Sequence, residues 1–283
     1  MMLLVPADPL RPRRPDEHFA AEAGAARAAG LDVAVVDHDA LTSADGATRG
    51  VARVPQDAGT AVYRGWMLRA GQYAAFAGAL ADRGVELRTG AAQYRQAHEL
   101  PGWYAALSDV TPPTQWSTGD DRDVFERAAA ALGPGPAVLR DYTKSMKHYW
   151  HEAVYIPDLA DVDAAWTVAA RFRELRDDEF TGGFVLRRFE EFGSAEVRTW
   201  WVGGVCRLVG PHPDTPHDAP PAGLDLSAVE PLVAALRLPF VTVDLALRAD
   251  GVWRVIELGD GQVSDRPGTV DPEAFVSGVI DPA

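Results

Sequence analysis

The sequence predicts a protein of mixed class, with a parallel α/β segment at the front and α+β segments behind it. Strand-like and helix-like patterns alternate over roughly the first hundred residues, which is typical of βαβ units. Beyond residue 110 the strand-like segments come in pairs joined by short turns, which indicates antiparallel hairpins. A chain of 283 residues, 47% of them hydrophobic, is long enough to form more than one compact unit.

The front segment is expected to form a parallel sheet with helices between its strands. Its predicted strands are residues 2–7, 31–37, 60–66 and 85–89, and its predicted helices are residues 16–30 and 70–84. The stretch "HELPGWYAALSDVTPPTQW" carries three prolines, so we predict that it leads out of this unit. We therefore place a domain boundary near residue 110.

The remaining chain predicts two α+β segments. The first has helices at 121–133 and 161–178 and strands at 137–141 and 182–192. The second has two hairpins and one helix at 225–237. The expected domains are residues 1–110, 111–188 and 189–283.

Composition excludes several classes of function. A net charge of −14 argues against nucleic-acid binding, which depends on clustered basic residues. No apolar run approaches the ~20 residues that span a bilayer, so we expect no membrane partner. The single Cys206 excludes an internal disulfide and suits a reducing compartment, so we expect a cytoplasmic protein. Composition does not indicate an oligomeric state.

The chain has two lysines, Lys144 and Lys147, both in "LRDYTKSMKHYW". All the other residues in its combined count of lysine and arginine are arginines. A lysine is a compact point charge on a flexible stem, which suits a phosphate oxygen in a crowded site. The alternative is chance in a chain whose composition resembles that of high-GC coding. The spacing favours a phosphate-binding role.

The stretch "AEVRTWWVGGVCRLVG" predicts a hairpin that turns at Gly203-Gly204. Pairing Val202 with Val205 would set Trp200 opposite Arg207 and Arg198 opposite Val209. One face of the hairpin would then be polar and either solvated or lining a cleft. That face would carry Glu196, Arg198, Trp200 and Arg207, and the other would carry Val197, Thr199, Trp201, Cys206 and Leu208. Cys206 is thus expected to be a packed thiol and not a nucleophile.

The stretch "FVTVDLALRADGVWRVIELGDGQVS" predicts a second hairpin, with its turn at Arg248 to Gly251. Pairing Leu247 with Val252 would place Asp244 and Glu257 on the same face, about 7–8 Å apart. Two carboxylates at that separation can bind one hard cation, and oxygen ligands suit Mg²⁺. The alternative is a carboxylate pair neutralised by Arg254 or Arg266.

These segments together resemble the ATP-grasp superfamily, specifically the RimK-related clade of small ligases that carries one arginine and two lysines in its first lobe. The resemblance implies an ATP-grasp fold over residues 110–265, preceded by a Rossmann-like parallel α/β domain. It matches the phosphate-binding residues to Arg140, Lys144 and Lys147. "GFVLRRFEEF" resembles the family's interlobe hinge, which assigns nucleotide contacts to Arg188, Glu190 and Glu191, with Glu190 as the main candidate for the ribose.

The resemblance also implies the metal site and the reaction. "EVRTWWVGG" resembles the hairpin whose arginine, here Arg198, faces the γ-phosphate or the substrate. Asp244 and Glu257 would bind Mg²⁺. The usual third ligand is an asparagine two residues after the glutamate, where this chain has Gly259, so Asp260 is the substitute. The implied reaction is ATP- and Mg²⁺-dependent joining of a small-molecule carboxylate to an amine through an acyl phosphate. The rival hypotheses are a non-catalytic nucleotide-binding module and a phosphotransferase.

Other candidate residues carry weaker signals. Arg64, at the end of a predicted parallel strand, is a candidate contact for the substrate carboxylate. His148 and His151 lack a third zinc ligand in the nearby sequence. His212 and His217 lie in the proline-rich "HPDTPHDAPP", for which we expect an exposed loop.

Overall fold

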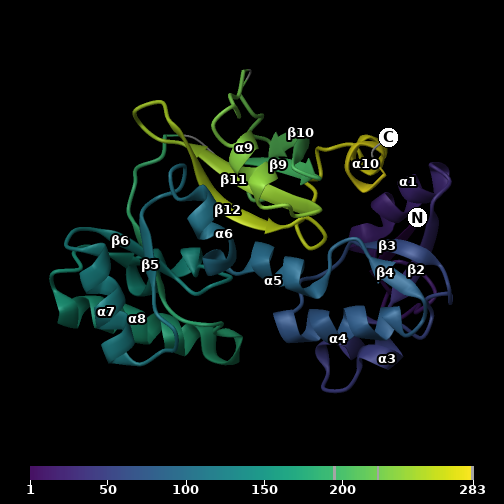
Figure 1. Ribbon diagram of the computed structural model, residues 1–283, viewed down its shortest axis with the longest axis horizontal. Coiled ribbons are helices and arrows are strands. Elements are labelled where there is room, and N and C mark those ends of the chain that lie inside the picture. Colours follow the sequence, from purple (N-terminus) through teal and green to yellow (C-terminus); the bar gives the residue numbers. More distant parts are fainter. Residues whose placement is uncertain (194–195, 222, 282–283) are drawn as a thin grey trace. The chain divides into compact units, whose positions relative to one another are not determined.

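The computed structural model describes residues 1–193, 196–221 and 223–281 (Figure 1). The chain forms two compact units, each built from segments distant in sequence. Unit 1 comprises residues 1–97, 195–245 and 257–283, and unit 2 comprises residues 98–194 and 246–256. Unit 1 thus combines most of the expected first and last domains. The division into 1–110, 111–188 and 189–283 stays a proposal.

The front of unit 1 is the predicted parallel sheet, in the order β2-β1-β3-β4. Its strands are β1 (Met2–Pro6), β2 (Asp32–Val36), β3 (Gly59–Tyr63) and β4 (Val85–Leu87). β1 pairs with both β2 and β3, and all three pairings of the sheet are parallel. Every residue of β1 is buried, as expected of a strand covered on both faces. The fold class expected for this segment is confirmed.

Helices cover both faces of this sheet. Leu4 and Tyr63 pack with Phe76 and Leu80 of α4 on one face, whereas Leu3 and Val5 pack on the other. Figure 1 shows α3 and α4 on one side of the sheet and α1 on the other. These helices are α1 (Ala20–Ala28), α2 (His38–Thr42), α3 (Ala47–Gly50), α4 (Ala70–Ala81) and, at the end of the chain, α10 (Pro272–Phe275), with 3-10 turn η1 (Glu17–Phe19) and π-turn η5 (Val276–Ile280).

Two further helices follow β4: α5 (Ala91–His98) ends where the three-proline stretch begins, and α6 (Leu100–Leu107) lies within that stretch. Pro101 lies in the first turn of α6, where a missing N–H costs no helical hydrogen bond.

The second sheet has the order β10-β9-β11-β12, with β9 (Val197–Val202), β10 (Val205–Pro211), β11 (Phe240–Leu247) and β12 (Trp253–Asp260). Helix α9 (Glu230–Ala235) precedes β11. The turn between β9 and β10 uses Gly203 and Gly204, whose φ angles of 57° and 82° lie in the left-handed region. This turn and the Val202–Val205 pair are as predicted.

The register beyond that turn differs from the prediction by one residue. The pairing shifts between Cys206 and Leu208, so Trp200 faces Leu208 and Arg198 faces Gly210. The irregularity turns Leu208 towards the core cluster that contains Trp200. Trp200 is fully buried, and the face expected to be polar is therefore partly core.

The second predicted hairpin, β11–β12, turns at Arg248 to Gly251 as expected. The backbone N–H of Arg248 donates to the Val252 carbonyl at 2.9 Å, so Arg248 and not Leu247 pairs with Val252. On the other side, β11 pairs with β9 and sets Asp244 directly opposite Arg198.

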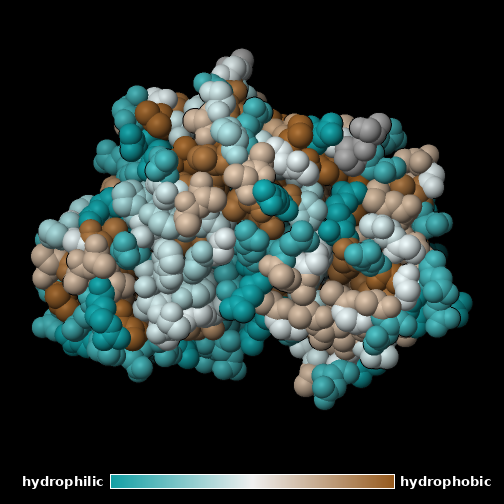
Figure 2. Space-filling view, in the orientation of Figure 1, coloured by the Kyte–Doolittle hydropathy of each residue, from teal (hydrophilic) through white to brown (hydrophobic). Residues whose placement is uncertain are grey.

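Unit 2 holds a third sheet, β5-β8-β6-β7, packed against two helices. Its strands are β5 (Thr114–Trp116), β6 (Ala137–Arg140), β7 (Tyr155–Ile156) and β8 (Val185–Arg188). Its helices are α7 (Arg122–Leu132) and α8 (Val162–Arg176), with short turns η2 (Lys147–Tyr149), η3 (Trp150–Val154) and η4 (Asp177–Glu179). Figure 2 shows hydrophilic side chains along the lower edge of the view, around these helices. Charged residues on α8 form ion pairs within the helix, as Arg171 does with Glu174, and with neighbouring segments, as Arg173 does with Asp120. No helix among the described residues is both long and apolar enough to cross a membrane.

Candidate active site

The two lysines lie on a loop of unit 2 that a single buried carboxylate organises. Oδ1 of Asp141 accepts hydrogen bonds from the backbone N–H groups of Thr143 and Lys144, both at 2.7 Å, and from the Thr143 hydroxyl. Its Oδ2 accepts from Nε of Arg176 at 2.9 Å. Lys144 and Lys147 are both exposed. The sequence interpretation missed Asp141, although an aspartate two residues before a threonine is a common turn signal.

Arg140 holds this loop through hydrogen bonds to its backbone. It is 5% exposed, and its guanidinium donates to the carbonyl oxygens of Asp141 and Thr143 at 3.3 and 2.8 Å. Those contacts orient the same backbone that carries Lys144. Of the three cations expected to bind phosphate, Lys144 and Lys147 are therefore accessible, whereas Arg140 is buried.

At the end of β8, Arg188 and Glu190 are engaged in contacts within unit 2. Nη1 of Arg188 donates to the Pro134 carbonyl just after α7 at 2.9 Å, and Nη2 donates to the carbonyl of Leu132, the last residue of α7, at 2.8 Å. Glu190 forms a two-point ion pair with Arg254, with both distances 3.0 Å. Glu191, by contrast, is exposed. Of these three expected nucleotide contacts, Glu191 is the most accessible.

In unit 1, Asp244 and Arg198 form a buried two-point ion pair across β9 and β11. Nε and Nη2 of Arg198 each donate to one oxygen of Asp244 at 2.8 Å. Burial alone would raise the pKa of Asp244, but Arg198 and His212 outweigh it and lower the pKa to about 2. Burial would likewise lower the pKa of Arg198, and the carboxylates of Asp244, Glu257 and Asp265 raise it instead. Asp244 is thus ionised at neutral pH, and its partner is neither of the arginines considered from sequence.

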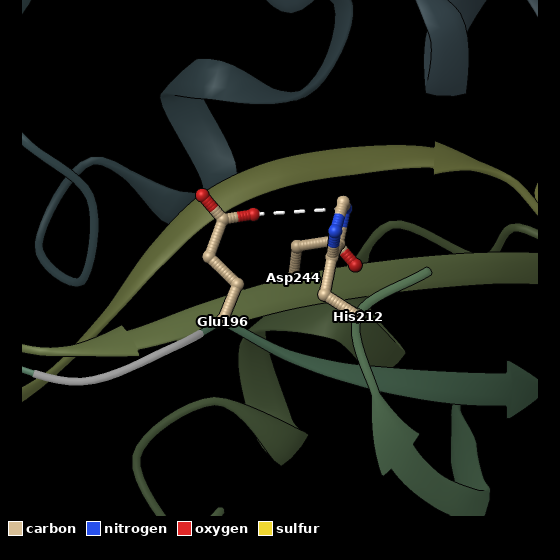
Figure 3. A group of neighbouring side chains, drawn as sticks. All are labelled: Glu196, His212 and Asp244. Carbon is tan, nitrogen blue, oxygen red and sulfur yellow. Dashed lines mark ion pairs between the residues drawn. The ribbon is translucent and has the colours of Figure 1, made fainter. Parts of the chain in front are cut away.

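His212 and Glu196 complete a cluster around Asp244 (Figure 3). Nε2 of His212 lies 3.6 Å from Asp244 and 3.7 Å from Glu196, and ligand atoms of all three residues lie within 4.8 Å of one another. Nδ1 of His212 accepts from the backbone N–H of Asp214 at 3.2 Å, and Nε2 lies 3.2 Å from Nη2 of Arg198. The expectation that His212 belongs to an exposed loop is wrong, because its side chain is largely buried in this cluster.

Glu257 and Asp260 have different surroundings. Glu257 is half-buried and close enough to Arg198 to affect its pKa. Asp260 is fully buried, and its Oδ1 accepts from the backbone N–H of Gln262 at 2.9 Å. Burial raises the pKa of Asp260 to about 7, so the carboxyl is about half protonated at neutral pH. Asp260 is not part of the cluster around Asp244.

Gly259 stands where the family usually has a metal-binding asparagine, and its surroundings explain the difference. A Cβ atom there would lie 3.3 Å from Oγ1 of Thr242 and 3.4 Å from Oγ of Ser264. These hydroxyls are hydrogen-bonded to each other at 2.7 Å. A side chain at residue 259 would therefore lie against two hydroxyl groups, and that of Thr242 would have to shift by a few tenths of an ångström.

Arg64, the expected contact for the substrate carboxylate, is instead a buried structural residue, and that expectation is corrected. It is 1% exposed and forms a two-point ion pair with Glu22. Its Nη1 donates to the carbonyls of Gly261, Gln262 and Ser264. The guanidinium also lies over the rings of Trp200 and Phe275, at 5.3 and 4.9 Å. A guanidinium with these partners has no accessible face for a ligand.

The donors around Asp244 fit a divalent cation. An ionised carboxylate offers about four lone pairs, and Arg198 takes one on each oxygen of Asp244. The carboxylate of Glu196 adds an oxygen donor, which Mg²⁺ prefers, and His212 offers Nε2. Cys206 offers nothing here, because burial raises its pKa to about 11 and keeps it a thiol.

A parallel α/β segment, a loop with two exposed lysines beside an antiparallel sheet, and a carboxylate cluster on a hairpin are the features expected from the resemblance to the ATP-grasp superfamily. Residues 131–279 match the family model described as ATP-grasp domain, R-2K clade family 3, and the chain belongs to this family. No curated protein has a sequence similar enough to match this chain.

Solved structures support the same fold. A RimK domain protein of the ATP-grasp type from Sphaerobacter thermophilus DSM 20745 is 17% identical, with a TM-score of 0.62 over 99% of this chain and 100% of that chain. The D-cycloserine synthetase DcsG is 20% identical, with a TM-score of 0.62 over 98% of each chain. The ATP-grasp ligase PsnB, solved with a minimal precursor, Mg and ADP, is 14% identical, with a TM-score of 0.54 over 100% of this chain and 94% of that chain.

Proposed function

We propose that this protein is a ligase that uses ATP and Mg²⁺ to join a carboxylate to an amine, with an amino-acid or peptide-like substrate. The observation that carries the proposal is the accessibility of Lys144 and Lys147 on a loop fixed by Asp141, in a chain of the ATP-grasp family. Two similar structures are described as a synthetase and a ligase, and one holds Mg and ADP.

The proposed reaction has two steps. A carboxylate oxygen of the substrate attacks the γ-phosphorus of ATP, the bond from that phosphorus to the bridging oxygen breaks, and ADP leaves. The amine then attacks the acyl carbon, the C–O bond breaks, phosphate leaves with the substrate's oxygen, and the amine gives up a proton to solvent.

The residues contribute charge and position and no covalent nucleophile. Lys144 and Lys147 neutralise phosphate oxygens, and Arg140 holds the backbone between β6 and Lys144 in place. Glu191 is the proposed acceptor for the ribose hydroxyls. Asp244, Glu257 and Glu196 would hold Mg²⁺, which supplies charge neutralisation at the phosphates. Arg198 keeps Asp244 ionised and oriented. We place the protein in the cytoplasm, on the single half-buried Cys206.

Calorimetry with ATP and Mg²⁺ tests the nucleotide site. Lys144→Ala and Lys147→Ala should each weaken ATP binding about tenfold, since each removes one charge-assisted contact of roughly 1.5 kcal/mol. Lys→Arg should restore it only in part, because a planar fork does not replace a point charge. Arg127→Ala, on the exposed face of α7, is the matched control. Unchanged ATP affinity in both alanine variants would reject the site.

A non-catalytic nucleotide-binding module remains the second candidate. It is favoured by the complete pairing of Asp244 with Arg198 and by Gly259 in place of the usual asparagine. This module would bind ATP through the same lysines yet release no ADP with any mixture of acids and amines.

A further inference from the structure

Unit 1 has a pocket of about 310 Å³ where strands β1 and β2 end. The carboxyl edge of a parallel sheet is where α/β proteins commonly bind small ligands. Pro6 lines the pocket from the end of β1, Asp37 and His38 from the end of β2, Arg49 and Arg53 from α3 and the turn after it, and Trp66 from the segment after β3. None of these residues belongs to the nucleotide or metal site proposed above.

The arginines at this pocket have no carboxylate partner of their own among the described residues. A more open hollow shares Arg53 with the pocket and is lined by Arg11, Arg13 and Arg14. Arg11 pairs with Asp8. Throughout the described parts of the chain, Arg13, Arg14, Arg49 and Arg53 meet no carboxylate within ion-pair distance. Unpaired guanidinium groups gathered in a chain of net charge −14 point to an anionic group of a ligand.

The same pocket also offers acceptors for a cationic group. Nδ1 of His38 lies 3.3 Å from the Tyr63 hydroxyl, which donates its own proton to the Trp66 carbonyl at 3.0 Å. Nδ1 must therefore donate, which leaves Nε2 of the neutral ring with a free lone pair. Burial lowers the pKa of His38 and favours this neutral form. Asp37 and Asp39, on either side of His38, add two carboxylates to the lining.

A continuous set of contacts within unit 1 connects this pocket to the cluster around Asp244. The ring of Trp66 lies 4.5 Å from the ring of His18. Nε2 of His18 lies 2.9 Å from a carboxylate oxygen of Asp265, and Nη1 of Arg198 donates to the Asp265 carbonyl at 3.2 Å. His18 and Asp265 thus link the lining of the pocket to Arg198, the partner of Asp244.

We propose that this pocket binds a free α-amino acid as one of the two substrates. Arg49 and Arg53 receive its carboxylate, and Nε2 of His38 with the carboxylates of Asp37 and Asp39 receives its ammonium group. The side chain lies along Trp66 and the nearby prolines. The role as substrate rests on the proposed ligase function, whereas the binding itself does not.

Saturation-transfer NMR on the full chain without nucleotide tests the binding. The probe is an equimolar mixture of the proteinogenic amino acids, in L form and in D form, with the matching decarboxylated amines as a separate sample. At least one amino acid should show transfer, and its amine should show at least fivefold less. Arg49→Ala/Arg53→Ala should remove the transfer, and Asp39→Asn should weaken it. Arg27→Ala, an exposed arginine on α1 outside the pocket, is the matched control.

Each outcome decides the proposal. Arg49 and Arg53 pair with no carboxylate of the described residues, so the double variant should keep the wild-type circular dichroism spectrum and urea midpoint. Transfer that survives in the double variant, amines that bind as well as amino acids, or no transfer at all would overturn the inference. Amino-acid binding without any ATP turnover would leave the pocket assigned and reject the ligase function. Turnover that the double variant retains in full would reject only the pocket.

Discussion

Asp260 makes the stability of unit 1 depend on pH. Its pKa is about 7 in the folded protein and 3.8 as a free side chain, because burial disfavours the charged form. The folded state therefore holds a proton that the unfolded state releases between these values. The contribution of Asp260 to the free energy of unfolding is at its maximum below pH 4, falls as the pH rises to about 7, and is constant above that.

Asp260→Asn should remove this dependence, because asparagine still accepts from the Gln262 N–H and carries no charge. Between roughly pH 4 and 7, the difference in the free energy of unfolding, variant minus wild type, should increase by about 1.4 kcal/mol per pH unit. Urea unfolding at several pH values measures the difference. A constant difference across this range would show that Asp260 is ionised in the folded protein and therefore available to a metal.

Arg64 should act on stability and not on substrate affinity. Arg64→Ala leaves the buried Glu22 carboxylate without its two-point partner, which costs on the order of 3–5 kcal/mol. Replacing both residues, as Glu22→Gln with Arg64→Met, should recover only part of this loss, because it removes the unpaired Glu22 charge but also takes from Arg266 its carboxylate partner at 3.4 Å. The urea midpoint at constant m-value is the measurement. A variant with normal stability and a raised KM for the acid would reinstate Arg64 as a substrate contact.

At the scale of an element, Asp141 fixes the conformation of the lysine loop. Asp141→Ala should expose the Lys144 amide, whose hydrogen bond to Oδ1 is 2.7 Å, and hydrogen exchange there should become at least tenfold faster. Asp158→Ala is the control, since Asp158 accepts from Gly135 and Ala160 in the same unit. Exchange in β6 reports whether the sheet stays intact. Unchanged exchange at Lys144 would mean that Asp141 does not order the loop.

The two adjacent glycines of the β9–β10 turn should differ in how well they tolerate alanine. Both have positive φ, so alanine at either one costs about 1–2 kcal/mol. A Cβ at Gly204 would also lie 2.8 Å from the Cα of Ala234 in α9, whereas Gly203 has open space. Gly204→Ala should therefore destabilise the protein by at least about 1 kcal/mol more than Gly203→Ala in thermal unfolding. Equal losses would mean that α9 moves away freely.

Elements defined by local pattern were predictable from the sequence. The buried strands of the parallel sheet, helices α7 and α8, and the Gly203-Gly204 turn follow from hydrophobic periodicity and turn chemistry. The shifted register of β10 was not predictable, because the bulge at Arg207 depends on what Leu208 packs against. A one-residue slip changes which side chains share a face.

The site residues likewise include some that were predictable from the sequence and some that were not. The lysine loop and Asp244 stood out because lysine is rare here and because a carboxylate interrupts an apolar strand. The roles of Arg64, Arg198 and His212 depend on partners distant in sequence, such as Glu22 for Arg64. No local sequence pattern distinguishes a buried, paired arginine from an accessible arginine that binds a ligand. The pocket at Arg49 and Arg53 was missed for the same reason, since strand ends far apart in the chain form it.

At the scale of the whole molecule, the proposed reaction needs two sets of charged residues that are far apart in sequence. Lys144 and Lys147 would contact the phosphates, and Asp244 and Glu257 would hold the metal. Loss of charge in either set should then stop the same turnover. Glu257→Gln keeps the side-chain volume, so it should abolish ADP release while leaving the urea midpoint near that of the wild type.

Transfer of oxygen from substrate to phosphate tests the central claim most directly. Amino acids labelled with ¹⁸O in the carboxyl group would be incubated with the protein, ATP, Mg²⁺ and a mixture of amines, and the released phosphate analysed by mass spectrometry. An acyl-phosphate ligase predicts one ¹⁸O atom in each phosphate, equimolar ADP and amide, and none of these with Glu257→Gln. ADP formed with unlabelled phosphate, or with the phosphoryl group retained on the product, would contradict the account.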